Sequence, residues 1–181
     1  MKFQSIVVLL LSSFAAAKLD TEEFNTFLEA CADGKVDFVK EELEKNPSFA
    51  KEHSAEGESC LHIAGIHGEI EVTKALLAAG ADPNLLTHMV DDPNAEPIQM
   101  HALSWHVFGG HLESAKLLLD HGADPNVLMD SIADEKERVT VLGMLEMLLQ
   151  EESEASEEEL RPFLEMRDLL KSRGAKRKDE L

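Results

Sequence analysis

Histidine and cysteine are the residue types of this chain that could hold a metal ion or act in catalysis. The eight histidines include His101, His106 and His111, which recur every five residues and would therefore be spread around a helix instead of sharing one face. The sequence has no His-x-x-x-His pair and no zinc-type cysteine cluster. It also has no nucleophile elbow and no phosphate-binding loop. We therefore predict that the protein is not an enzyme and has no catalytic residues, cofactor or metal centre.

The two cysteines, Cys31 and Cys60, do not form a Cys-x-x-Cys motif, which excludes a redox centre of the thioredoxin type. Two cysteines are too few for a disulfide framework, although a pair can form a bridge in an oxidising compartment. Each cysteine occupies a small-residue position in the repeat pattern described next. We therefore expect two buried free thiols, with a disulfide as the alternative.

The pentapeptide Gly-Ala-Asp-Pro-Asn occurs twice, at Gly80–Asn84 and Gly122–Asn126, 42 residues apart. Four flanking elements repeat at the same spacing: Ser59 with His101, Leu61 with Leu103, Gly68 with Gly110, and Leu76-Leu77 with Leu118-Leu119. A register shared across a whole helix–turn–helix–turn unit indicates a repeat array. Such arrays expose long faces and rarely build catalytic pockets, so the repeat favours a binding function.

Residues 59–84 read S-C-L-H-I-A-G-I-H-G, then a helical stretch, then G-A-D-P-N. This resembles the ankyrin repeat, whose 33-residue unit opens with T-P-L-H-x-A and ends with G-A-D-x-N. Ser59 is expected to cap the first helix by accepting from its free N–H groups. Gly68 would allow the turn between the helices, and Gly80 the left-handed conformation that ends the second. The resemblance implies that His62 is the structural histidine that hydrogen-bonds between neighbouring repeats.

We predict an all-α fold, an ankyrin-repeat solenoid of about four helix–turn–helix units with extended hairpin fingers over residues 18–175. The units cover about residues 22–53, 57–84, 99–126 and 138–175. In the third unit, Ser104 stands where the histidine belongs and His106 where a small residue is expected. We keep the unbroken 42-residue register over an alternative that starts from Met100-His101-Ala102. In this register, a histidine at position 106 indicates that the helix is locally repacked to accommodate it. The alternative is that His106 is a polar contact site.

The fourth unit contains an acidic insert, Glu151–Glu159. Ser156 and Glu159 resemble a capping box, but Pro162 would then lie inside the helix. We therefore expect the second helix to start near Pro162. Its buried face should consist of Phe163, Met166, Leu169 and Leu170.

Two loops are longer than the short hairpin of a standard ankyrin unit. The 42-residue spacing leaves nine extra residues within Leu85–Met100, and Val127–Val139 is also extended. Both carry apolar side chains, which either pack back onto the concave face or contact a partner. The resemblance implies that hairpin tips and surface positions of the first helices form the partner surface. The residues that we expect to bind a partner are Ile66, His67, Met89, Val90 and Phe108.

Both ends of the sequence resemble targeting signals. An apolar run, Ile6–Leu11, is too short to span a bilayer and precedes Ala15-Ala16-Ala17, which predicts a signal peptide over residues 1–17. Residues 176–181 should be a flexible tail. It ends in the ER-retention motif Lys178, Asp179, Glu180, Leu181, which a KDEL-type retrieval receptor would bind. We therefore expect a soluble protein of the endoplasmic reticulum (ER) lumen.

The net charge of −19, or −20 once Lys2 is removed with the signal peptide, excludes nucleic acid and anionic membranes as partners. Basic proteins or calcium would be attracted. We predict a non-catalytic protein–protein interaction module, an adaptor or scaffold for other lumenal proteins, with no small-molecule substrate. The alternative is an acidic, low-affinity calcium-binding or chaperone-associated lumenal protein. That alternative lacks any Asp-x-Asp-x-Asp-Gly calcium loop.

Overall fold

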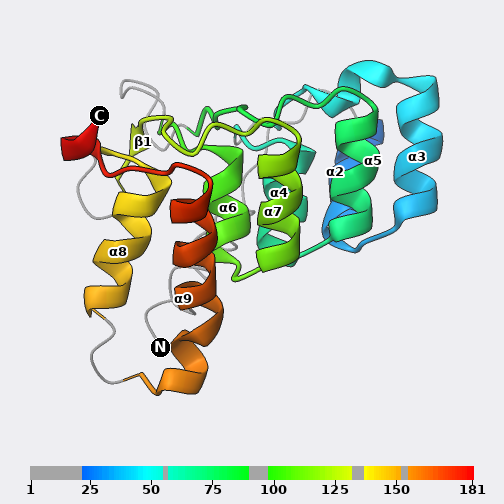
Figure 1. Cartoon of the computed structure of the whole chain (residues 1–181). Helices are drawn as coiled ribbons and strands as arrows, with labels where there is room; N and C mark the ends of the chain where they lie inside the picture. The colour runs from blue at the N-terminus through cyan, green and yellow to red at the C-terminus, as the bar shows by residue number, and fades with distance from the viewer. Residues whose placement is uncertain (1–21, 55–56, 90–97, 132–136, 152–154) are drawn as a thin grey trace.

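The structure is a computed structural model that describes residues 22–54, 57–89, 98–131, 137–151 and 155–181 (Figure 1). Its elements are α2 (Glu22–Ala32), α3 (Val36–Lys45), the 3-10 helix η2 (Pro47–Ala50), α4 (Cys60–His67), α5 (Ile70–Ala78), α6 (Ala102–Phe108), α7 (Leu112–Asp120), β1 (Met129–Asp130), β2 (Arg138–Val139), α8 (Val141–Glu151), α9 (Glu157–Ser172) and the 3-10 helix η3 (Lys178–Glu180). Within these residues, no helix has the length and apolar character needed to cross a membrane.

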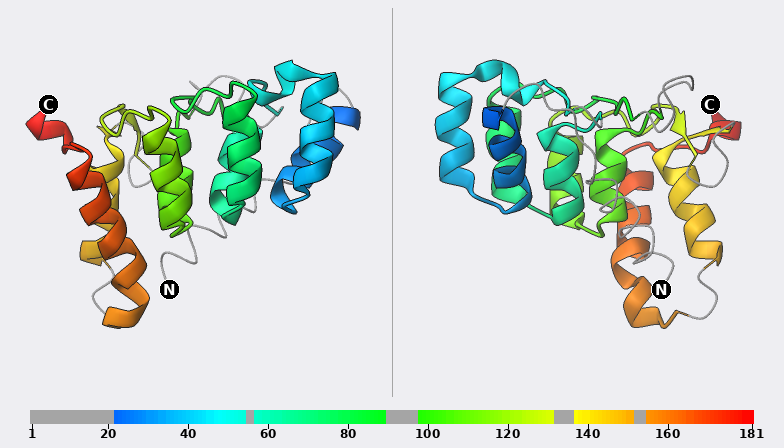
Figure 2. Two further views of the ribbon diagram at one scale, coloured as in Figure 1. Left: turned by 45° about the vertical axis from the view of Figure 1, so that its right-hand side comes forward. Right: turned by 180° about the vertical axis from the view of Figure 1, so that it is seen from behind.

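The helices form four pairs, α2–α3, α4–α5, α6–α7 and α8–α9, which stack side by side into a two-layered array (Figures 1 and 2). The first helices of successive pairs pack against one another, and so do the second helices. We call the pairs, with their loops, units one to four. Apart from the small β1–β2 hairpin, the described secondary structure is helical, which confirms the predicted all-α solenoid.

The 42-residue register is confirmed. Helices α4 and α6 begin directly after Ser59 and His101, and Gly68 and Gly110 have nearly equal φ angles of +76° and +74°. The glycines that follow the second helices, Gly80 at +88° and Gly122 at +90°, are in the left-handed region, as expected. Ser59 occupies the cap position of α4 and forms a capping box with His62, whose Nδ1 accepts from the Ser59 N–H at 3.2 Å and lies 2.8 Å from the Ser59 hydroxyl.

The last residue of the repeated pentapeptide links one unit to the next. Asn84 Nδ2 donates to the Gly122 carbonyl at 3.2 Å, and Asn84 Oδ1 accepts from the Asp124 N–H at 2.7 Å. Asn126 makes the same pair of bonds to the Gly174 carbonyl and the Lys176 N–H. These asparagine bridges hold the three consecutive turns in a row.

The expectation of free thiols is wrong, because Cys31 of α2 and Cys60 of α4 form a disulfide. Both residues are buried where units one and two meet. Small side chains at these positions let the two helices approach closely, and the same approach brings the Cα atoms to 5.8 Å, within the range that a disulfide requires.

The expected start of α9 is also wrong, because the helix begins at Glu157 and contains Pro162. Ser156 Oγ accepts from the Glu159 N–H at 3.3 Å, and Glu159 Oε2 accepts from the Ser156 N–H at 2.8 Å. This capping box satisfies two terminal donors, whereas Pro162 in the second turn removes one helical bond. The predicted apolar face is confirmed, since Met166 and Leu170 are buried and Phe163 and Leu169 pack against the core.

The extended fingers are antiparallel at their bases. Met89 pairs with Ile98 in the first finger, and β1 pairs with β2 in the second. The fingers also bond to each other, because Asp130 accepts from the Gln99 N–H at 2.7 Å through Oδ2 and donates its own N–H to the Gln99 carbonyl. Met89 and Ile98 are half-buried against the core, so the base of the first finger packs back onto the array.

Candidate functional site

Two of the predicted partner-binding residues are not on the surface. Ile66 is 5% exposed and Phe108 is 1% exposed, and both belong to the hydrophobic core. The reason lies in helices α4 and α6, whose apolar residues continue around the whole circumference. A helix of this composition is buried on all sides. The family rule for surface positions therefore does not hold at these two residues.

Of the other three predicted residues, the two that the structure describes, His67 and Met89, do not lie together. His67 is the exposed last residue of α4, whereas Met89 is half-buried in the first finger, where it pairs with Ile98. Val90 lies outside the described residues. A helix of eight residues is about 12 Å long, and His67 and the finger bases lie at opposite ends of the first helices (Figure 1). The structure therefore does not bring the four described candidates together.

His106 repacks its helix, as one of the two sequence interpretations expected. Its ring is buried, with Nδ1 2.6 Å from Ser114 Oγ and Nε2 3.2 Å from the carbonyl of Leu61 in unit two. Gly65 makes room for it, because a Cβ there would lie 2.5 Å from His106 Cδ2. Burial lowers the pKa of His106 to about 3, so the ring is neutral at physiological pH. Nε2 then carries the hydrogen that it donates to Leu61.

His111 makes a second bond of the same kind, with its Nε2 3.1 Å from the Ile66 carbonyl. The two histidines are five residues apart, and so are their acceptors, Leu61 and Ile66. The five-residue spacing that argues against a metal site therefore serves to join units two and three. Sequence reasoning missed this role, because the acceptors are backbone atoms of another unit.

His62, the expected inter-repeat histidine, bonds to Ser59 of its own unit through the Ser59 N–H at 3.2 Å and the hydroxyl. Burial lowers the pKa of His62 well below its usual range, and the Met100 backbone of unit three opposes this only in part. The His62 ring also meets the edge of Trp105 in unit three, at 5.7 Å between ring centres. His62 is therefore a structural residue at the same boundary between units.

The contacts of His62, His106 and His111 thus link units two and three. Among the described residues, no group of three or more His, Cys, Asp or Glu side chains could hold a metal ion. The described surface has a hollow of about 460 Å³ between α3 and α5, a groove between α8 and α9, and an exposed end of the chain.

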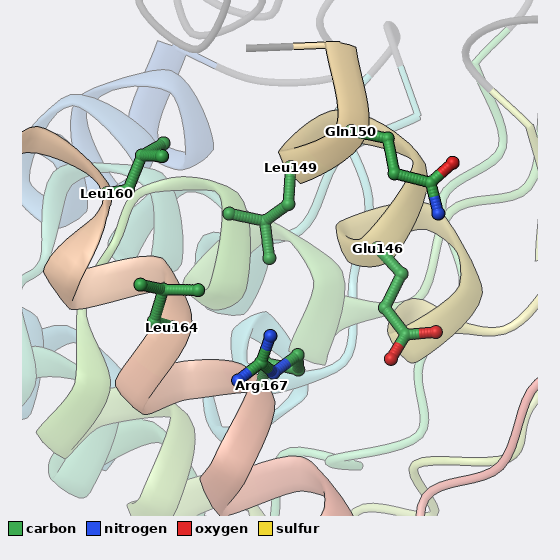
Figure 3. Close-up of a pocket in the computed structure, with 6 residues that line it drawn as sticks. All are labelled: Glu146, Leu149, Gln150, Leu160, Leu164 and Arg167. Carbon is green, nitrogen blue, oxygen red and sulfur yellow. The ribbon is translucent and has the colours of Figure 1, made fainter. Parts of the chain in front are cut away.

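The groove lies between α8 and α9 and has a volume of about 380 Å³ (Figure 3). Leu149 from α8 and Leu160 and Leu164 from α9 form its apolar part. Its polar lining is Glu146, Gln150 and Arg167. Sequence reasoning missed this site, although the four-residue spacing of Leu160 and Leu164 marks a second apolar stripe on α9 beside the buried one.

The C-terminal residues are exposed from Lys176 to Leu181. Lys178–Glu180 form the single 3-10 turn η3, in which the Arg177 N–H donates to Glu180 Oε2 at 2.8 Å. The segment expected to be a flexible tail therefore contains a turn. Its exposure agrees with the accessibility that a recognition motif requires.

Comparison with known proteins gives the family. The family described as ankyrin repeats (3 copies) matches this chain over residues 2–87 and again over residues 27–129. No curated protein matches the chain with significant similarity. The matched segments cover more than half of the chain, and the stacked helix pairs with their left-handed glycines agree with them. The chain belongs to the ankyrin-repeat family.

Proposed function

We propose that this protein is a protein–protein interaction module of the ER lumen. In this proposal, residues 1–17 are removed as a signal peptide and Lys178–Leu181 bind a KDEL-type retrieval receptor. Ankyrin repeats indicate a protein-binding role. The location in the ER lumen is proposed in addition to this role, from the signal-peptide pattern and the Lys-Asp-Glu-Leu motif.

The exposed C-terminus is the observation that carries the proposal. Ala175 is buried, and the Lys176 N–H still bonds to Asn126 Oδ1 of unit three at 2.8 Å. The four residues from Lys178 onward lie on the surface directly beyond this last bond, and Leu181 is 60% exposed. A receptor could therefore bind the tetrapeptide without unfolding any repeat.

The disulfide gives independent support for the address. Disulfides persist in oxidising compartments such as the ER lumen and are rare in the cytosol. The Cys31–Cys60 bridge joins the first helices of two units and is buried, so it is part of the folded array. A lumenal protein can form and keep such a bridge.

The charge suggests the chemistry of the partner. At −19, the chain attracts basic protein surfaces and repels nucleic acid and anionic membranes. The partner that we propose is a lumenal or lumen-facing protein with a basic and apolar surface.

The test is retention in cells. A tagged copy with the tag placed after the signal peptide should stay in the ER, and deletion of Lys178–Leu181 should send it into the medium. A matched control replaces Lys176 and Arg177 by alanine and keeps the tetrapeptide, so that it alters the charge of the tail but not the motif. Secretion that is the same for all three proteins would refute the proposed address.

A further inference from the structure

The last helix pair extends beyond the rest of the array. Leu112, the first residue of α7, precedes Gly122 by ten residues, whereas Glu157, the first residue of α9, precedes the corresponding Gly174 by seventeen. Helix α9 thus has seven more residues than α7 at its N-terminal end, and α8 is also longer than α6. Figure 1 shows the ends of α8 and α9 projecting past the other helices. We call residues 148–151 and 155–163 the tip.

The two flanks of α9 have different environments. On the inner flank, Phe163 approaches Gly110 and Arg173 forms an ion pair with Asp120 at 2.7 Å, both in unit three. Leu160, Leu164 and Arg167 follow a separate stripe, spaced four and then three residues apart, and line the groove with Leu149 (Figure 3). The groove therefore lies on the flank that faces away from unit three.

Within the array, the corresponding face is covered by helices. Each unit from one to three receives the two helices of the following unit against its own pair. In unit three, Ala115 and Leu119, seven and three residues before Gly122, are buried. At the same distances before Gly174, unit four has Arg167 and Lys171. Arg167 and Lys171 are ion-paired with Asp168 and Glu146, at 3.0 and 2.6 Å, so this face presents neutralised charged side chains where another ankyrin unit would pack against apolar ones.

The negative charge of the tip favours a basic ligand over a second copy of this chain. The tip carries Glu151, Glu157, Glu158 and Glu159 but only one basic residue, Arg161, which gives a net charge of −3. A second copy of this chain would bring a like-charged tip and a total charge of −19, which disfavours self-association. A basic segment would be attracted to the same residues.

We propose that the groove between α8 and α9 binds a basic amphipathic helix of a partner protein. Apolar side chains of that helix, at positions i, i+3 or i+4, and i+7, fill the space beside Leu149, Leu160 and Leu164. Its Lys and Arg residues face the glutamates of the tip. This inference rests on the protein-binding part of the proposed function and not on the lumenal address.

The test uses the purified full chain and a synthetic 14-residue peptide, about four helical turns long, with leucines on one helical face and lysines elsewhere. Calorimetry should show binding of this peptide but not of the same pattern with glutamate in place of lysine. Leu160→Asp should weaken binding by about tenfold or more, as for a central apolar contact. The matched control is Leu128→Asp, which places the same charge at a leucine that is 36% exposed in the second finger. It should leave binding within about twofold.

Equal weakening by Leu160→Asp and Leu128→Asp would overturn the proposal, since binding would then depend only on the overall charge. Binding of the glutamate peptide, or a dimer in sedimentation that Leu160→Asp dissociates, would also overturn it. Fluorescence of the buried Trp105 checks that each variant is folded. If Leu160→Asp unfolds the chain, Leu164→Ser replaces it, with the same expectation.

The test of the groove can fail independently of the test of the proposed function. A chain that stays in the ER and captures lumenal proteins equally well with and without Leu160→Asp would contradict the groove and leave the function standing. A chain that binds the lysine peptide through the groove but is secreted with its tetrapeptide intact would contradict only the address.

Discussion

Gly65 of α4 lies against the ring of His106, and this contact gives a quantitative test of the packing between units two and three. A methyl group at Gly65 would lie 2.5 Å from His106 Cδ2, closer than any normal contact. The ring cannot move away without stretching its bonds to Ser114 and the Leu61 carbonyl. Gly65→Ala should therefore be destabilising, although alanine is the better helix former.

The size and the sign of this effect follow from two terms. Alanine in place of glycine inside a helix stabilises by about 0.5–1 kcal/mol. Overpacking a close contact costs about 1–3 kcal/mol, so the net effect of Gly65→Ala should be a loss of up to about 2.5 kcal/mol. His106→Ala alone should cost roughly 3 kcal/mol or more, because it removes two buried hydrogen bonds and leaves a cavity in place of the ring. In the His106→Ala background the clash is absent, and Gly65→Ala should then stabilise by about 0.5–1 kcal/mol.

The assay is equilibrium unfolding in urea, followed by the fluorescence of Trp105, which is the only tryptophan and is buried in α6. Four proteins complete the double-mutant cycle: wild type, each single variant and the double variant. The packing argument predicts that Gly65→Ala changes sign between the two backgrounds. The same loss of stability in both backgrounds would refute it.

Three further predictions concern the backbone, the titration of the histidines and the disulfide. Gly57 (φ +89°) and Gly122 (φ +90°) share the same left-handed φ, but only at Gly57 would an added Cβ meet a neighbouring backbone, at 2.2 Å from that of His88. In urea unfolding, Gly122→Ala should therefore cost about 1 kcal/mol and Gly57→Ala clearly more, and equal costs would contradict this. Burial lowers the pKa of His101 to about 4 and that of His106 to about 3, whereas both titrate near 6.5 when unfolded. Below pH 6.5 the unfolded chain therefore binds more protons than the folded chain. The contribution of these two neutral histidines to the free energy of unfolding is complete above pH 6.5, and it falls toward pH 4 by up to ~1.4 kcal/mol per pH unit for each histidine. His106→Ala should flatten this dependence, and an unchanged slope would count against the assignment. The Cys31–Cys60 bridge spans a sequence separation of 29, for which loop entropy gives ~3.6 kcal/mol. Replacing both cysteines by alanine should lower the free energy of unfolding by roughly that amount, and identical urea midpoints would show that the bridge does not stabilise the fold.

The fold was predictable because the repeat is a local pattern copied at a fixed spacing. Gly80 and Gly122 mark the ends of second helices through their backbone freedom, and the 42-residue interval located the corresponding helices of two units. The start of α9 was harder to predict, since Ser156 and Pro162 favour different starts. The capping box decided the outcome.

The candidate site was less predictable, because it depends on contacts between units. The family rule placed Ile66 and Phe108 on the surface, although the apolar residues around α4 and α6 already indicated burial. The pairing of Cys31 with Cys60 depends on a distance that sequence does not give. Predicting the groove from sequence would have required the lengths of α8 and α9, which exceed those of the other helices. The acidic insert between them made these lengths hard to infer.

The most direct test of the central claim is translation of the full chain in the presence of ER microsomes, followed by protease treatment and mass analysis. A lumenal interaction module should be protected from the protease, and its mass should correspond to a chain that begins at Lys18 with a Cys31–Cys60 bridge. An unprotected chain that still contains residues 1–17 would contradict the lumenal account.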